Sequence, residues 1–259
     1  GNSNVYIFLG GITLSTSPDV VLELTDSFGV DQINSPSFGF GYRINGVGDI
    51  NGDDIDDLAV ADLSRFVFSS DPAQFANSEG VVFIVYGSEF QKDAPPVLTP
   101  DKIIYRNEQD LSTRIRNFGW TIRGVDFNGN GTNDLVILPR ESRDVSDFNN
   151  GKEAVFIYDG GAEFDENPDK VYPLPATPFG LPDGNLGFTG GELIPLPDLN
   201  NDGSQELLYT SSPSVKNAAL FLGGSQDFQA DAILESPNAS SSLGFLRSLV
   251  NLEHFASLG

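Results

Sequence analysis

The chain of 259 residues contains no cysteine, no methionine and a single histidine. Without cysteine it forms neither disulfides nor thiolate metal sites, and it has no thiol nucleophile. Basic residues are also scarce, because 14 Lys and Arg stand against 37 Asp and Glu and give a formal net charge of −23. Nucleic acids and anionic membranes need clustered basic residues, so neither is expected as a partner. No apolar run approaches about 18 residues, so no direct membrane insertion is expected.

Turn-forming and aromatic residues, in contrast, are abundant. The chain has 28 glycines, 16 prolines and 20 phenylalanines. Glycine and proline are the residues that tight turns require, and phenylalanine supplies large side chains for a core. No long uncharged stretch shows helical periodicity. The sequence therefore predicts an all-β protein, organised as one domain over 1–259, because β-rich domains reach this length.

One element recurs four times as an apolar segment that ends in glycine and is rich in β-branched and aromatic residues. Such segments are typical of strands buried on both faces. After a loop, a shorter strand candidate follows each of them. The apolar segments are 5–10, 82–87, 155–160 and 218–223. The shorter candidates are 20–24, 102–106, 170–175 and 232–236.

A second element is a glycine between apolar or aromatic residues, at 38–40, 118–120, 186–188 and 243–245. Phe40 and Trp120, which follow this glycine, are expected to pack between neighbouring sheets. Three of the copies lead into an acidic loop and then an apolar run, at 58–60, 135–137 and 207–209. Each repeat is therefore strand, acidic loop, strand, strand, strand, which is typical of a four-stranded propeller blade.

The repeats cover 38–106, 118–175 and 186–236, with a fourth repeat split between 243–259 and 1–24. Pairing of the N- and C-terminal strands would complete a four-bladed β-propeller and remove its exposed sheet edges. Alternatively, the chain is a fragment of a larger, seven-bladed propeller. The protein is a monomer if its ends pair within one chain; if they cannot meet, the open blade edges should pair between chains and give an oligomer.

The three acidic loops begin at Asp49, Asp126 and Asp198 and are nine residues long. Each carries side-chain oxygens at positions 1, 3, 5 and 9, and position 7 can add a backbone carbonyl. A flexible shell of oxygen ligands suits Ca²⁺ better than Mg²⁺, which prefers near-octahedral sites that retain water. The spacing therefore predicts about three calcium ions.

Two other calcium motifs do not fit these loops. An EF-hand needs a glutamate at position 12, where this chain has Val60, Ile137 and Tyr209. Calcium-binding β-rolls repeat short glycine-rich motifs back to back, whereas here a whole repeat separates one loop from the next.

The order Phe-Gly, Asp-x-Asn-x-Asp-x-x-x-Asp and apolar strand resembles the FG-GAP repeat of integrin α-subunit propellers. The resemblance covers nearly the whole chain and implies calcium ligands in the loop between the first two strands of a blade. The implied ligands are Asp49, Asn51, Asp53, Asp57, Asp126, Asn128, Asn130, Asp134, Asp198, Asn200, Asp202 and Glu206, with the carbonyls of Ile55, Thr132 and Ser204.

This chain departs from the family pattern in several places. Asn130 stands where an aspartate is usual, and Glu206 is longer than the usual aspartate. The fourth repeat has lost the motif at 250–254 and is expected to be metal-free. Integrin propellers have seven blades, whereas four repeats are found here.

The resemblance implies a calcium-stabilised binding or adhesion module that recognises a protein or glycan ligand through a propeller face. It implies an extracellular or cell-surface location, because calcium is plentiful outside the cell. The periplasm is the alternative location. We expect no enzyme, because His254 is the only histidine and no Gly-x-Ser-x-Gly motif is present. The alternative is a hydrolase or lyase acting on polysaccharides or esters and built on the same calcium-binding propeller.

Overall fold

The structure, a computed structural model, describes residues 4–10, 16–23, 39–67, 78–90, 100–105, 113–139, 141–144, 154–173, 192–210, 217–224 and 231–235. These residues are almost entirely in strands and turns, with one short 3₁₀ turn, Gly87–Glu89. The prediction of an all-β protein is confirmed. Among the described residues no helix is long and apolar enough to cross a bilayer.

Three antiparallel sheets of four strands make up most of the fold, and in each the order of the strands across the sheet follows their order along the chain. The first sheet contains β3 Phe40–Gly48, β4 Asp57–Val67, β5 Ser78–Val85 and β6 Lys102–Tyr105. The second contains β8 Thr121–Val125, β9 Asp134–Leu138, β11 Ala154–Tyr158 and β12 Lys170–Pro173. The third contains β13 Glu192–Leu196, β14 Glu206–Thr210, β15 Asn217–Phe221 and β16 Ala232–Glu235.

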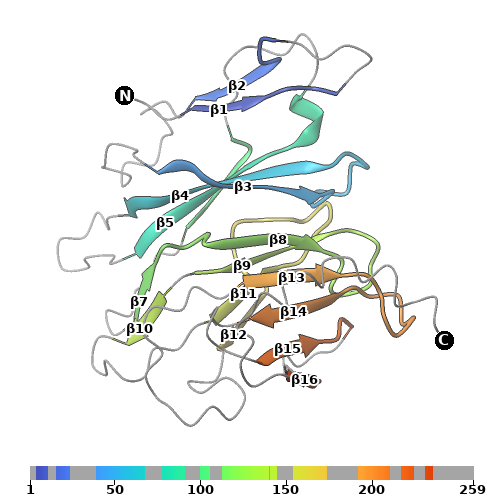
Figure 1. Cartoon of the computed structure of the whole chain (residues 1–259). Coiled ribbons are helices and arrows are strands. Elements are labelled where there is room, and N and C mark those ends of the chain that lie inside the picture. The colour runs from blue at the N-terminus through green and yellow to red at the C-terminus, as the bar shows by residue number, and fades with distance from the viewer. Residues whose placement is uncertain are drawn as a thin grey trace.

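Two hairpins accompany the sheets. One pairs β1 Asn4–Ile7 with β2 Val20–Glu23, and the other pairs β7 Thr113–Arg116 with β10 Glu141–Asp144. The sequence did not predict the second hairpin. Figure 1 shows the β1–β2 hairpin and the three large sheets as successive levels in chain order. The described strands form no closed barrel or ring.

Apolar side chains fill the spaces between successive levels. Val82 of the first sheet and Ile137 of the second belong to one buried cluster. Val155 of the second sheet and Tyr209 of the third belong to the next. Because a middle sheet is covered on both faces, every residue of β9 is buried, as expected for apolar runs without alternation.

The aromatic residues after the Phe-Gly glycines lie at these junctions. Phe40 is buried, and its ring packs edge-on against Phe83 with 5.6 Å between the ring centroids. Trp120 is half-buried against the cluster between the first two sheets. The corresponding Leu-Gly-Phe elements at 186–188 and 243–245 lie outside the described residues.

One strand expectation is wrong. The segment 5–10 was expected to be buried on both faces, but Tyr6 is 58% exposed and Phe8 is 53% exposed, whereas Val5 is buried. Val5 faces the first sheet, in a cluster that contains Phe83. Tyr6 lies on the opposite face of the strand, and no described sheet covers that face. The predicted pairing of this strand with 243–259 lies outside the described residues, as does the metal-free loop at 250–254.

Candidate metal centre

Each acidic loop joins the first two strands of a four-stranded sheet. The loops connect β3 to β4, β8 to β9 and β13 to β14. In all three the acid at position 9 is the first residue of the second strand: Asp57, Asp134 and Glu206. These three side chains are 2%, 0% and 0% exposed. The strand therefore holds the last acid of the loop against the interior, while positions 3 to 6 of each loop are exposed or half-buried.

The first loop winds around the carboxylate of Asp49. Its Oδ1 accepts hydrogen bonds from the backbone N–H groups of Gly52 at 2.7 Å and Asp53 at 3.1 Å. Asn51 Oδ1 also accepts from Asp53 N at 2.9 Å, and Asp53 Oδ1 accepts from Ile55 N at 2.9 Å. The tight winding needs a left-handed residue, and Gly52 supplies it with φ 81°. Side chains at positions 1, 3 and 5 are thereby turned inward.

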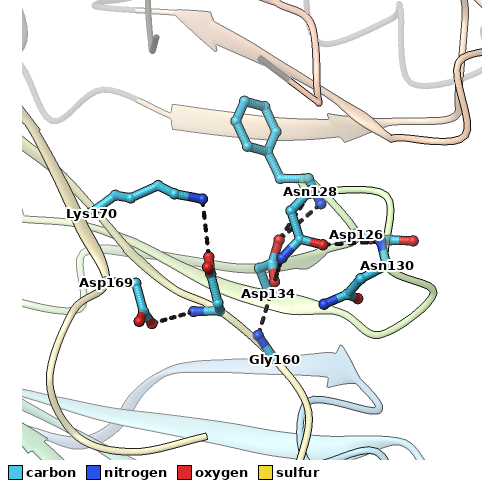
Figure 2. A network of polar contacts seen from close by, with 9 residues as sticks. Asp126, Asn128, Asn130, Asp134, Gly160, Asp169 and Lys170 are labelled. Carbon is cyan, nitrogen blue, oxygen red and sulfur yellow. Dashed lines mark hydrogen bonds and ion pairs between the residues drawn. The ribbon is translucent and has the colours of Figure 1, made fainter. Parts of the chain in front are cut away.

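The second loop repeats this conformation, as Figure 2 shows. Asp126 accepts from Asn130 N at 3.0 Å and Gly131 N at 2.9 Å. Asn128 Oδ1 accepts from Asn130 N at 3.0 Å, and Asn130 Oδ1 accepts from Thr132 N at 2.8 Å. Asparagine at position 5 therefore makes the same loop contact that aspartate makes in the first loop.

The third loop follows the same pattern. Asp198 accepts from Asn201 N at 2.7 Å and Gly203 N at 2.9 Å. Asn200 Oδ1 accepts from Asp202 N at 2.9 Å, and Asp202 Oδ1 accepts from Ser204 N at 2.9 Å. Three loops far apart in sequence thus share one conformation around an acid at position 1.

The acid at position 9 ties its loop to the turn that ends the third strand of the sheet. Asp57 accepts from Ile50 N at 3.0 Å and Gly87 N at 2.8 Å. Asp134 accepts from Gly160 N at 2.9 Å in the same way (Figure 2). A side chain at Gly160 would collide with the backbone carbonyl of Asn133. Gly87 and Gly223 approach a backbone carbonyl in the same way, which explains why the apolar segments of the three large sheets end in glycine.

Glu206 behaves differently from the two aspartates. Its Oε2 accepts from Leu199 N at 2.8 Å, whereas Oε1 is buried with no hydrogen-bond partner. A buried carboxylate oxygen without a partner is destabilising, because it has lost water and gained nothing in exchange. The third loop therefore contains an oxygen that a cation could satisfy.

Burial raises the pKa of all three position-9 acids, and the pKa of Asp134 rises to about 6. At position 5 of the third loop the effect is opposite, because the hydrogen bond from Ser204 lowers the pKa of Asp202. The inner end of each loop thus holds a carboxylate whose charge is poorly solvated, and a bound cation would stabilise that charge.

Backbone hydrogen bonds from the next repeat hold the first two loops. Asn133 N donates to the carbonyl of Asp49 at 3.0 Å, and Gln205 N donates to that of Asp126 at 2.8 Å. Gln205 also accepts from Asp126 N through Oε1 at 3.0 Å. A residue at position 8 of one loop therefore fixes position 1 of the loop before it. The residue types do not predict this connection, because backbone atoms leave no pattern in them.

An aspartate that was not predicted closes four hairpins of the fold. Asp19, Asp101, Asp169 and Asp231 stand directly before β2, β6, β12 and β16, respectively. They accept hydrogen bonds at 2.8 to 2.9 Å from the backbone N–H groups of Leu9, Tyr86, Asp159 and Leu222, respectively. The signal was present, since Pro stands directly before Asp in three of the four copies. The β1–β2 hairpin is thus closed in the same way as the hairpins of the three large sheets.

The structure brings positions 1, 3 and 5 of each loop together by hydrogen bonds, and it directs position 9 toward the backbone. Among the described residues, no three His, Cys, Asp or Glu side chains are arranged to hold a metal ion by themselves. The expected ligand sets do not depend on acids alone, because each includes at least one asparagine and one carbonyl.

No protein-family model matches the chain, and a search of curated proteins also finds no match.

Proposed function

We propose that this chain is a calcium-stabilised β-propeller module of the FG-GAP, integrin-α-like kind that binds about three calcium ions. The observation that carries the proposal is the shared conformation of the three acidic loops, each between the first two strands of its sheet. In each loop oxygens at positions 1, 3, 5 and 9, with the carbonyl at position 7, would hold the ion. Calcium would neutralise carboxylates that the fold brings close together.

The residues present fit this ion. Glu206 is 0% exposed and its Oε1 has no hydrogen-bond partner, so this oxygen is available to coordinate a hard cation. Carboxylate, amide and carbonyl oxygens are the ligands that calcium prefers. The net charge of −23 favours cation binding further.

The β1–β2 hairpin supports a fourth repeat. Asp19 closes this hairpin at Leu9, as Asp101 closes the corresponding hairpin of the first sheet at Tyr86. We therefore assign β1 and β2 to the third and fourth strands of a blade whose first two strands come from elsewhere. A propeller assembled from such blades would account for the way successive sheets stack face to face.

Within this fold the chain would act outside the cell as a binding or adhesion module for a protein or glycan, with calcium in a structural role. Ions surrounded by this many protein oxygens leave few positions for a substrate. Extracellular calcium is sufficient to fill sites of moderate affinity.

Counting bound calcium tests the proposal. The protein is dialysed against calcium, and bound metal is measured by mass spectrometry alongside the melting temperature with and without EDTA. We expect about three ions per chain and a lower melting temperature in EDTA, because a ligand that binds only the native state stabilises it.

Two variants of the first loop sharpen the test. Asp49→Asn changes position 1, whereas Asp56→Asn removes the same charge from the exposed position 8 of the same loop. We expect Asp49→Asn to lose one ion and Asp56→Asn to keep all of them. Unchanged metal content in Asp49→Asn, or no calcium in the parent protein, would contradict the proposal.

A further inference from the structure

The first strands of the three large sheets lie beside one another, and a cluster of cationic and aromatic side chains joins them. β8 contacts both β3 and β13, and Figure 1 shows the three strands at successive levels. The cluster consists of Tyr42 and Arg43 of β3, Trp120 before β8, Arg123 of β8 and Glu192 of β13. We call it the Arg43 cluster. None of its members belongs to an acidic loop.

A bulge in β3 presents Tyr42 and Arg43. Phe40 pairs with Asp62 and Arg43 pairs with Ala61, so two extra residues of β3 lie opposite one step of β4. Gly41, with φ 81°, permits this turn of the backbone. Bulges often redirect a side chain at a functional site. Tyr42 is left 60% exposed at this point.

Arg43 is stacked but makes no hydrogen bond to the described residues. Its guanidinium carbon lies 4.5 Å from the ring centroid of Trp120 and 5.8 Å from that of Tyr42. Its Nε is buried with no hydrogen-bond partner. Among the described residues Arg43 forms one ion pair, in which Glu192 Oε1 is 3.7 Å from a terminal nitrogen, too far for a hydrogen bond.

Arg123, in the same cluster, has a structural role, because its donors are used by groups of the fold. Its Nε donates to the carbonyl of Leu193 at 2.7 Å, and a terminal nitrogen donates to that of Ile122 at 2.7 Å. Its other terminal nitrogen donates to Glu192 Oε2 at 3.1 Å. Arg123 therefore makes the hydrogen bond to Glu192, whereas Arg43 forms only a longer ion pair with that carboxylate. Arg43 is held in place by aromatic rings, and its terminal N–H groups donate no hydrogen bond to the described residues and are available to another group.

We propose that Arg43 and Tyr42 form a binding site for a uronic-acid residue of a glycan. The proposal rests on the proposed function, since it names the ligand class of that binding module. The planar guanidinium pairs with the carboxylate of the sugar, which matches its fork of N–H donors. The exposed ring of Tyr42 supports the apolar face of the sugar ring, beside the tilted ring of Trp120 at 6.2 Å.

Two observations select this ligand over other anions. Two arginines and one glutamate leave the cluster with one net positive charge inside a chain of net charge −23, so a single carboxylate is favoured over a polyanion. An acidic peptide side chain also offers a carboxylate, but it has no ring to lie on Tyr42. The sugar uses both the cation and the aromatic surface.

Trp120 gives a direct readout, because it is the only tryptophan in the chain and touches Arg43. Its fluorescence is followed as methyl galacturonide or methyl glucuronide is added to the calcium-loaded protein. The neutral methyl galactoside and glucoside are the ligand controls, and N-acetylaspartate amide represents an acidic peptide. We expect saturable binding of at least one uronide and at least tenfold weaker binding of the neutral glycosides and the peptide analogue.

Variants then assign the contacts. Arg43→Gln and Tyr42→Ala should each weaken uronide binding by about tenfold or more. Lys102→Gln removes the same charge as Arg43→Gln from the outer strand β6, where Lys102 pairs with Glu166, and should bind normally. Calcium content and melting temperature, measured on every sample, show that each variant is folded.

Several results would overturn the inference. These are equal binding of uronide and neutral glycoside, unchanged affinity in Arg43→Gln, and tight binding of the peptide analogue that survives Tyr42→Ala. Absence of any uronide response in a protein that binds its calcium would overturn this inference alone. Absence of calcium would instead contradict the proposed function.

Discussion

Asp134 has no exposed surface, and its carboxylate oxygens accept hydrogen bonds from backbone N–H groups of its own loop and of Gly160. Burial raises its pKa from 3.8 to about 6 in the metal-free protein. The folded state therefore holds this proton more tightly than the unfolded state. As the pH rises from about 4 to 6, the free energy of unfolding should fall, because the unfolded chain gives up its proton first.

The magnitude follows from the difference between the two pKa values. Each pKa unit corresponds to about 1.4 kcal/mol, so ionised Asp134 destabilises the metal-free protein by up to about 3 kcal/mol above pH 6. Asp57 and Glu206 act in the same direction, because burial raises their pKa as well. Calcium would reverse the sign, since it binds the ionised carboxylates and competes with protons.

Urea unfolding at pH 4 to 7.5, in EDTA and in calcium, measures this effect. Asp134→Asn should show a smaller decrease in the free energy of unfolding over this range in EDTA than the parent protein. The slope is the readout, because the hydrogen bonds lost in the variant lower its stability equally at every pH. Asp56→Asn, which changes an exposed acid, should retain the parent slope. Identical slopes for the parent protein and Asp134→Asn would refute the reasoning.

Two further predictions concern individual positions. By calorimetry, Asp49→Ala should weaken the first calcium site more than Asn130→Ala weakens the second, because a carboxylate contributes a charge and an amide only a dipole; equal losses would contradict this. Gly160→Ala should lower the free energy of unfolding by about 1–3 kcal/mol, because the new methyl group meets the carbonyl of Asn133. Gly10→Ala, at the matching position of the first hairpin, meets nothing within 4 Å and should be nearly neutral in the same denaturation assay; equal effects would argue against the steric explanation.

The strands and the loops were predictable because their signals are local. The run Leu135 to Ile137 is apolar in the sequence itself, and each acidic loop carries its pattern within nine consecutive residues. Both can therefore be recognised without knowing which segments lie beside them in the fold. The exposure of Tyr6 was not predictable, because it depends on which sheet covers that face rather than on the strand itself. The Arg43 cluster depends equally on tertiary placement. Tyr42, Trp120 and Glu192 are far apart in sequence, and only the stacking of the three sheets brings them together.

In the proposed function, calcium binding and sheet stacking would involve the same residues of the first two loops. Asp49 would bind the ion through its side chain, while its carbonyl accepts a hydrogen bond from Asn133 N of the next repeat at 3.0 Å. In the same way, the carbonyl of Asp126 accepts a hydrogen bond from Gln205 N at 2.8 Å. A substitution of the position-1 residue should therefore weaken the hydrogen bonds at the junction between sheets before it affects the sheets themselves.

Hydrogen exchange can detect that order of events. In EDTA the amides of Asn133 and Gln205 should exchange faster by at least tenfold, because opening a junction needs less free energy than unfolding a sheet. The amide of Val136, in the middle of the second sheet, should change much less at the same temperature and pH. If all three amides accelerate equally, calcium stabilises the fold as a whole. If none does, the ions are not coupled to these junctions, and the hydrogen bonds between repeats hold without them.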